Sequence, residues 1–161
     1  MEVDTLEVKQ VLKRSLLTGF LGGIFWCMIT LVLHYFNIID VSPYDYLKWF
    51  KLSEKWLKTF AGVVFTILIY GIISIGIAYL YYLFFKKIEG LLIGIVYGLM
   101  LFVFVLIIIP QINSHVPNIL LMSYRSITTS ICLFILYGLF IGYSISFDYK
   151  QMKVQLKMKH R

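Results

Sequence analysis

Three side chains in this sequence, His34, Asp40 and His115, are of types that bind metal ions or titrate near neutral pH. His34 lies near the end of the first long apolar stretch, Asp40 follows that stretch, and His115 lies in a later polar segment. Imidazole and carboxylate groups are common zinc ligands, and imidazole changes its charge between about pH 5 and pH 8. Nothing in the spacing requires a shared site, and the alternative for His34 is a polar residue at the membrane interface. The sequence therefore predicts no metal site and no cofactor.

The two cysteines, Cys27 and Cys132, both lie inside apolar stretches. Cysteine in such surroundings is usually an inert packing residue, and two thiols are too few to hold a metal ion. The sequence contains no Ser-His-Asp set, no HExxH motif and no phosphate-binding loop. Ion-coupled transporters usually place ionisable groups inside the membrane, whereas the apolar stretches here contain no acid and no Arg. We therefore expect no catalytic residues and a protein that is not an enzyme.

The elements that carry these residues are four stretches without charge, at 16–36, 59–85, 91–109 and 127–147. A helix needs about 20 residues to cross a bilayer core of about 30 Å. Segments that span a bilayer must satisfy their backbone groups internally, so each stretch is read as a helix. The sequence predicts an all-α integral membrane protein with four transmembrane helices, which form a single membrane domain over 1–161.

Positive charges are divided unequally between the two sides of this arrangement. The side that holds both termini carries ten Lys and Arg residues and the opposite side carries five. The ten are Lys9, Lys13, Arg14, Lys86, Lys87, Lys150, Lys153, Lys157, Lys159 and Arg161, and the five are Lys48, Lys51, Lys55, Lys58 and Arg125. Because cytoplasmic segments are enriched in Lys and Arg, both termini are predicted to be cytoplasmic. We expect a multi-pass protein of the plasma membrane.

Segment 148–161 is predicted to be a basic cytoplasmic tail that contacts anionic lipid headgroups. The cationic side chains are Lys150, Lys153, Lys157, Lys159 and Arg161. Each cation near such a surface contributes about 1 kcal/mol. The alternative is a solvated tail that only sets topology. Because the adjoining membrane is the nearest polyanion, we expect lipid partners and no nucleic acid.

The segment between the first two spans is predicted to form an amphipathic helix over 43–57. Ser42 and Pro43 are typical of a helix start. Aromatic residues favour one side of this helix and lysines the other, which is typical of a helix lying in the outer membrane interface. The alternative is a simple connector.

Glycines recur at a spacing of four within the spans, which favours close helix packing in lipid. The predicted packing positions are Gly19, Gly23, Gly76, Gly90, Gly94, Gly98, Gly138 and Gly142. In the first, third and fourth spans they fall in the cytoplasmic half, whereas the run 101–109 in the outer half is bulky. We expect a bundle that is tight at the cytoplasmic side and splayed outside. A splayed half could admit a lipid chain, and the alternative is that Phe and Leu side chains fill it.

A set of residues in a fixed order resembles a known family. The order begins with Gly19-x-x-Gly22-Gly23-x-x-Trp26 and Ser42-Pro43, continues with Ser74-Ile75-Gly76-x-Ala78-x-Leu80-Tyr81-Tyr82 and Gly94-x-x-Tyr97-Gly98, and reaches Pro110. It ends with Thr128-Thr129-x-x-Cys132-Leu133 and Tyr137-Gly138-x-Phe140-Ile141-Gly142-Tyr143-Ser144-Ile145-Ser146. The pattern, over about residues 15–150, resembles the YqhR family of small membrane proteins from spore-forming Gram-positive bacteria. The resemblance implies a four-helix plasma-membrane protein and assigns no catalytic or binding residue.

The expected function is that of a non-enzymatic interaction or scaffold component, which contacts another membrane protein or a second copy of itself. The basis is the absence of reactive motifs together with small-residue faces on which helices can dock. The alternative is a lipid-binding or small apolar-molecule-binding protein, or a transport subunit, that uses a splayed outer half. A membrane enzyme is a further alternative, and it would need polar side chains that converge at one depth.

Overall fold

The computed structural model describes residues 2–48, 52–85, 91–112 and 119–159, and helices dominate them. Four helical segments are long and apolar enough to cross a membrane: Leu12–Tyr35, Phe60–Phe85, Leu92–Ile112 and Tyr124–Gln151. They overlap the four stretches that the sequence marks as spans. The prediction of an all-α protein with four membrane-spanning helices is therefore confirmed.

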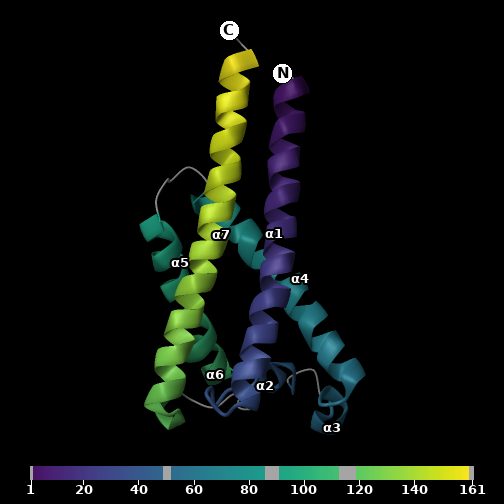
Figure 1. Ribbon diagram of the computed structural model, residues 1–161, viewed down its shortest axis with the longest axis vertical. Helices are drawn as coiled ribbons and strands as arrows, with labels where there is room; N and C mark the ends of the chain where they lie inside the picture. Colours follow the sequence, from purple (N-terminus) through teal and green to yellow (C-terminus); the bar gives the residue numbers. More distant parts are fainter. Residues whose placement is uncertain (1, 49–51, 86–90, 113–118, 160–161) are drawn as a thin grey trace.

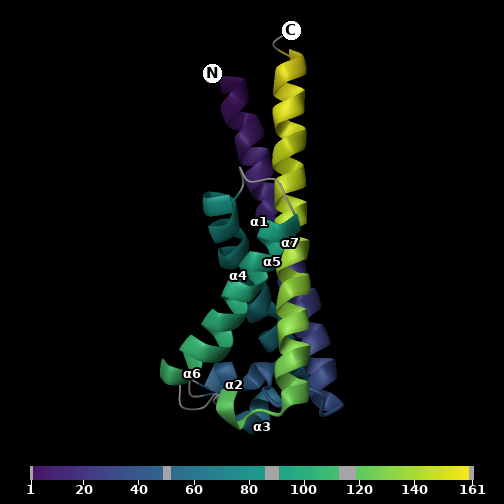
Figure 2. The same ribbon diagram turned by 90° about the vertical axis from the view of Figure 1, so that its left-hand side faces the viewer.

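The long helices form two antiparallel pairs. Helix α1 (Glu2–Tyr35) packs along α4 (Phe60–Phe85), and α5 (Leu91–Val103) packs along α7 (Tyr124–Lys159). Contacts between α1 and α7 join the pairs. The start of α1 and the end of α7 lie at one end of the bundle and extend past the other helices (Figures 1 and 2). The short helices lie at the opposite end of the bundle, which we call the α2 end.

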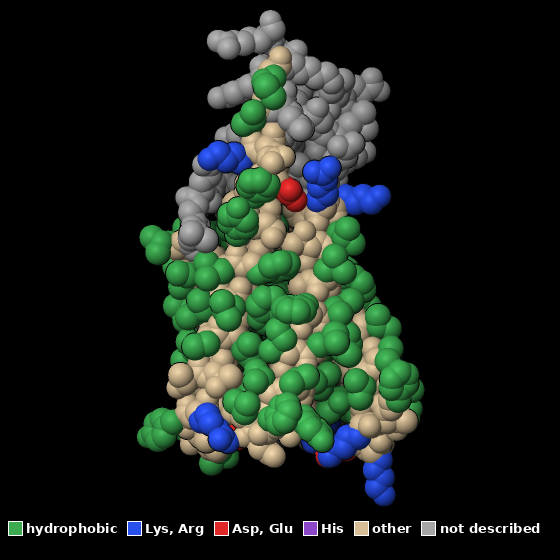
Figure 3. All heavy atoms as spheres, viewed as in Figure 1, with side chains coloured by type: hydrophobic (Ala, Val, Ile, Leu, Met, Phe, Trp, Pro, Cys, Tyr) green, Lys and Arg blue, Asp and Glu red, His purple; other side chains and the backbone are tan. Residues whose placement is uncertain are grey.

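The surface of the bundle is largely apolar. Apolar side chains cover the middle of the face in Figure 3, and Lys and Arg side chains lie nearer its two ends. Leu21, Phe25 and Ile72 are among the large apolar residues that are more than half exposed. A water-soluble protein rarely exposes such a continuous apolar surface, whereas lipid tails solvate it without cost.

The third span departs from regular α-helix in its second half. A π-helical segment, η2 (Phe104–Ile108), separates α5 from α6 (Ile109–Ile112). Pro110 has no N–H to donate, and its ring crowds the carbonyl of Leu106 in a regular helix. A wider π turn directly before the proline accommodates that crowding. The span therefore continues through Ile112, although the sequence predicts its end at residue 109.

Two short helices stand where the sequence predicts one over 43–57. Ser42 begins α2 (Pro43–Leu47): its hydroxyl accepts a hydrogen bond from the N–H of Tyr44 (3.3 Å). In return, the carboxylate of Asp45 accepts one from the N–H of Ser42 (2.9 Å). Helix α3 (Glu54–Leu57) starts anew after Ser53, whose backbone is extended. This extended residue is the reason that no single helix covers the segment.

An ion pair network ties α2 to α3. The Nζ atom of Lys48 lies 2.9 Å from Oδ1 of Asp45 and 3.2 Å from Oε2 of Glu54. Hydrogen bonds to these carboxylates raise the pKa of Lys48 above its ordinary value. Hydrogen bonds from Lys58 and Lys48 lower the pKa of Glu54. The two helices therefore form one connected cover at the α2 end.

Candidate functional site

Glycines bring α5 and α7 into close contact. A methyl group added at Gly94 would lie 2.9 Å from the backbone oxygen of Gly138, and one added at Gly98 would lie 2.9 Å from Cα of Ile135. One added at Gly142 would lie 3.0 Å from Cα of Gly94. Real Cβ atoms essentially never approach other heavy atoms within 3.0 Å. The two helices therefore lie backbone to backbone at these positions.

Gly19 and Gly23 serve the contact between α1 and α4. A methyl group at Gly19 would lie 2.9 Å from the backbone oxygen of Ser74, and one at Gly23 would lie 2.7 Å from that of Tyr70. The Ser74 hydroxyl donates a hydrogen bond of 2.5 Å to the carbonyl of Gly19. Such interhelical bonds to backbone oxygens add to packing as a source of helix association in lipid.

The other predicted site residues are placed differently. Gly76 lies on the exposed side of α4, and no atom of the described chain lies within 4 Å of an added methyl group. Gly90 lies outside the described residues. The basic segment continues α7 as a helix through Lys159, and Lys150 is exposed. The side chains of Lys153, Lys157 and Lys159, and the whole of Arg161, lie outside the described parts of the structure.

Helices α4 and α5 touch in the half of the bundle away from the α2 end. The Tyr97 hydroxyl donates a hydrogen bond of 2.7 Å to the carbonyl of Ile77, and the rings of Tyr81 and Tyr97 lie 5.0 Å apart. From there α5 diverges from α4 toward the α2 end (Figure 1), while Phe102 and Leu106 stay packed against α7. The divergence leaves space between the four helices in that half of the bundle.

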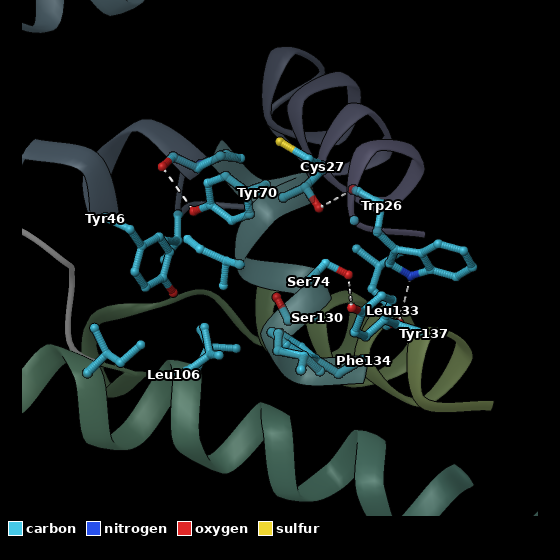
Figure 4. Close-up of a pocket in the computed structure, with 18 of the residues that line it drawn as sticks. Trp26, Cys27, Tyr46, Tyr70, Ser74, Leu106, Ser130, Leu133, Phe134 and Tyr137 are labelled. Carbon is cyan, nitrogen blue, oxygen red and sulfur yellow. Dashed lines mark hydrogen bonds between the residues drawn. The ribbon is translucent and has the colours of Figure 1, made fainter. Parts of the chain in front are cut away.

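That space is a cavity of about 520 Å³ with a mostly apolar lining. Cys27 and Thr30 of α1, Tyr70 and Ile73 of α4, and the π segment of α5 form three of its walls. The fourth wall is α7, through Ser130, Leu133 and Phe134 (Figure 4). Gly23 lines the cavity, and the other close glycine contacts of α1, α5 and α7 lie farther from the α2 end than the cavity does.

Satisfied polar groups form the floor of the cavity. The indole N–H of Trp26 donates to the carbonyl of Leu133 (2.9 Å). The hydroxyls of Ser74 and Tyr137 are hydrogen-bonded to each other, and Ser74 also donates to the α1 backbone. Figure 4 shows the bond between Ser74 and Tyr137 and the bond from Trp26 to Leu133. The floor therefore contains polar groups, but each of them already has a hydrogen-bond partner within the protein.

The cover of the cavity comes from the segment that follows α1. Ile39, Val41 and Leu47 are buried, and together with Pro43 they line the cavity at the α2 end. The Tyr70 hydroxyl donates a hydrogen bond of 3.1 Å to the carbonyl of Pro43. The cover is therefore fastened to α4 as well as to α1.

Polar contacts also fasten this cover to the start of α7. The carboxylate of Asp40 accepts hydrogen bonds from the N–H and the hydroxyl of Ser123 (2.7 and 2.9 Å). The N–H of Asp40 donates to the hydroxyl of Ser126 (2.9 Å). Arg125 donates to the carbonyl of Asn37 (2.5 Å), where the backbone turns through the left-handed region (φ 54°). Residues 37–47 thus form a strap across the end of the bundle.

Two hydroxyl groups face the cavity without a hydrogen-bond partner among the described residues, and they belong to Ser130 and Tyr46. Ser130 is only 5% exposed, and both residues line the cavity (Figure 4). Burial raises the pKa of Tyr46, which keeps its hydroxyl protonated and able to donate. The sequence analysis missed both residues, because a serine and a tyrosine among many carry no spacing signal.

The cavity is partly open, and the exposure of three lining residues indicates that the opening lies at the side of the bundle. Three of its lining residues are also exposed: Ile73 of α4, Phe104 of the π segment and Ile112 of α6. These residues belong to two segments that are long and apolar enough to span a membrane. The opening between them therefore faces hydrocarbon rather than water once the spans lie in a bilayer.

The residues considered for a metal or pH-responsive site are engaged separately. Nδ1 of His34 donates to the carbonyl of Ile39 (3.1 Å) at the end of α1. Asp40 accepts from Ser123, which lowers the pKa of the Asp40 carboxyl. His115 lies outside the described residues. Within the described ranges, no three His, Cys, Asp or Glu side chains lie close enough to hold a metal ion.

Comparison with known proteins relates the whole chain to one family. The family described as "Conserved membrane protein YqhR" matches residues 3–160. The "Uncharacterized protein YqhR" of Bacillus subtilis (strain 168) is 39% identical over 139 residues, which cover 86% of this chain and 78% of that relative. No solved structure matches the chain. The resemblance seen in the sequence is therefore confirmed, and the chain belongs to the YqhR family of conserved membrane proteins.

Proposed function

We propose that this protein binds the hydrocarbon chain of a membrane lipid in its cavity and does not catalyse a reaction. The observation that carries the proposal is an apolar cavity of about 520 Å³ that opens sideways, between α4 and the π segment. Ligand sites for small molecules usually enclose roughly 300–1,000 Å³ and are lined mainly by apolar side chains. A sideways opening at membrane depth admits molecules that are already dissolved in the bilayer.

The predicted topology adds a location to this proposal. With both termini in the cytoplasm, the α2 end lies outside, and the cavity lies in the outer half of a plasma membrane. The lipid would enter from the outer leaflet. The basic end of α7 would then lie at the cytoplasmic face, near anionic headgroups.

A pair of cysteines allows a matched test of the cavity. Cys27 is buried and lines the cavity, whereas Cys132 is exposed on α7. Cys27→Phe fills part of the cavity, and Cys132→Phe adds the same group to the outer surface. Native mass spectrometry after mild delipidation should show retained lipid on the wild type and on Cys132→Phe, and little on Cys27→Phe. Equal retention by the two variants, or none by the wild type, would refute the proposal.

A second candidate function is docking to another membrane helix, and the position of Gly76 favours it. A glycine on an exposed face lets a neighbouring backbone approach closely in lipid. Large apolar residues on the same helix, including Ile72 and Leu80, are half or more exposed and would surround such a contact. This arrangement suits a scaffold or interaction component that binds another protein or a second copy.

Crosslinking in native membranes tests the docking candidate. Gly76→Ile should remove a crosslinked partner or dimer, because its side chain would separate the backbones. Ala61→Ile makes a similar change at another exposed position of α4 and serves as the control. If Gly76→Ile and the wild type give the same crosslinked species, this face is not the docking surface.

A further inference from the structure

The Ser130 side chain differs from three threonines of these helices. Thr30, Thr66 and Thr128 each donate to the carbonyl four residues earlier, at 2.8–2.9 Å. Ser and Thr in transmembrane helices commonly satisfy themselves in this way. The Ser130 hydroxyl makes no such bond in the described chain and points into the cavity instead (Figure 4).

Tyr46 presents a second hydroxyl to the same cavity from a different element. Ser130 belongs to α7 and Tyr46 to the short helix of the cover, so the two groups approach the cavity from separate walls. Tyr70, by contrast, uses its hydroxyl to bind Pro43 and is satisfied. An unpaired hydroxyl in apolar surroundings is costly unless a partner enters the space.

A saturated hydrocarbon chain gives these hydroxyls no partner. A carbonyl oxygen has two lone pairs and can accept a hydrogen bond from each of two hydroxyls. We infer that the cavity selects a lipid-soluble molecule with a carbonyl group inside its apolar body, and that Ser130 and Tyr46 donate to that oxygen. This inference rests on the proposed function, because it specifies the class of molecule that the same cavity takes.

A matched pair of ligands distinguishes recognition of a carbonyl group from binding of any hydrocarbon chain. The probes are a long-chain ketone and the alkane of the same chain length, each competing with a fluorescent lipid for the full-length protein in detergent. One net hydrogen bond corresponds to a preference of about threefold to tenfold. Two such bonds multiply, so the wild type should bind the ketone about tenfold to a hundredfold more tightly than the alkane.

Variants assign the preference to the two hydroxyls. Ser130→Ala and Tyr46→Phe should each lower the ketone preference and leave the affinity for the alkane unchanged. Ser130→Thr keeps a hydroxyl and should retain the preference. Thr128→Val, which changes an exposed residue of α7, should have no effect. Using two single-hydroxyl variants keeps the test decisive if one of them does not fold.

The possible outcomes distinguish the two proposals. Equal affinity of the wild type for ketone and alkane overturns the carbonyl inference and leaves chain binding standing. A ketone preference that stays at the wild-type level in both Ser130→Ala and Tyr46→Phe also overturns it. If neither ligand displaces the fluorescent lipid, the proposed function fails as well.

Discussion

Ser123 donates two hydrogen bonds to one carboxylate oxygen of Asp40, from its N–H at 2.7 Å and from its hydroxyl at 2.9 Å. These bonds join the strap that follows α1 to the residue that precedes α7, across 83 positions of sequence. They add polar contacts to a cover whose helix α2 has only five residues.

The first prediction concerns pH. The bonds from Ser123 lower the pKa of Asp40 below its ordinary value of 3.8. A carboxyl with a lowered folded-state pKa contributes stability that is present above the unfolded value and lost as pH falls through the folded value. The thermal midpoint of the purified protein should therefore fall as pH drops below about 4.

The variant Asp40→Ala should weaken this pH dependence and lower stability at neutral pH by about 1 kcal/mol, since the site is exposed. Ser53→Ala is the control, because the Ser53 side chain makes no capping hydrogen bond. An Asp40→Ala variant whose midpoint still follows the wild-type pH curve would show that Asp40 is not the responsible group.

The second prediction compares two glycines. Gly138→Ala places a methyl group against the backbone of Gly98, which cannot move without shifting α5. It should destabilise the fold by roughly 1–3 kcal/mol, the usual cost of overpacking. Gly76→Ala meets open space and should be neutral or stabilising by up to about 1 kcal/mol, because alanine favours helix.

Unfolding of both variants in mixed micelles, followed by circular dichroism, measures this difference. Similar midpoints for Gly138→Ala and Gly76→Ala would contradict the packing of α5 on α7.

The third prediction uses the indole at the floor of the cavity. Trp26 lines the cavity, and in a Trp49→Phe, Trp56→Phe background it is the remaining source of tryptophan fluorescence. A lipid with a brominated chain should quench this fluorescence in the wild-type cavity. Adding Cys27→Phe should reduce the quenching, whereas Cys132→Phe should not. Quenching that is equal in the two variants would mean that the bromine reaches Trp26 from the surrounding bilayer.

The fourth prediction concerns orientation. Single cysteines at position 53, near the α2 end, and at position 151, near the end of α7, are introduced in a Cys27→Ser, Cys132→Ser background. A maleimide that cannot cross membranes should label position 53 of intact cells and spare position 151 until the cells are opened. Labelling of position 151 alone in intact cells would reverse the predicted topology.

The sequence by itself determined the number of spanning helices and the family. Uncharged runs of about 20 residues have the length of spanning helices, which satisfy their backbone groups internally where no water is present. The glycine spacing also indicated where close contacts are possible. It could not indicate which glycine faces a neighbouring helix. Gly98 packs on α7, whereas Gly76 faces outward, although both were predicted as packing positions.

Only the tertiary structure decided that this half contains a cavity beside a packed cluster of Phe102, Leu106 and Met122, and is not filled throughout by Phe and Leu side chains. The outcome depends on how far α5 leans from α4 and on where the π segment aims Phe104 and Leu106. Those features follow from contacts between segments far apart in the chain. Ser130 illustrates the reason: its residue type predicts a bond to its own helix, and the space between four helices leaves its hydroxyl facing the cavity instead.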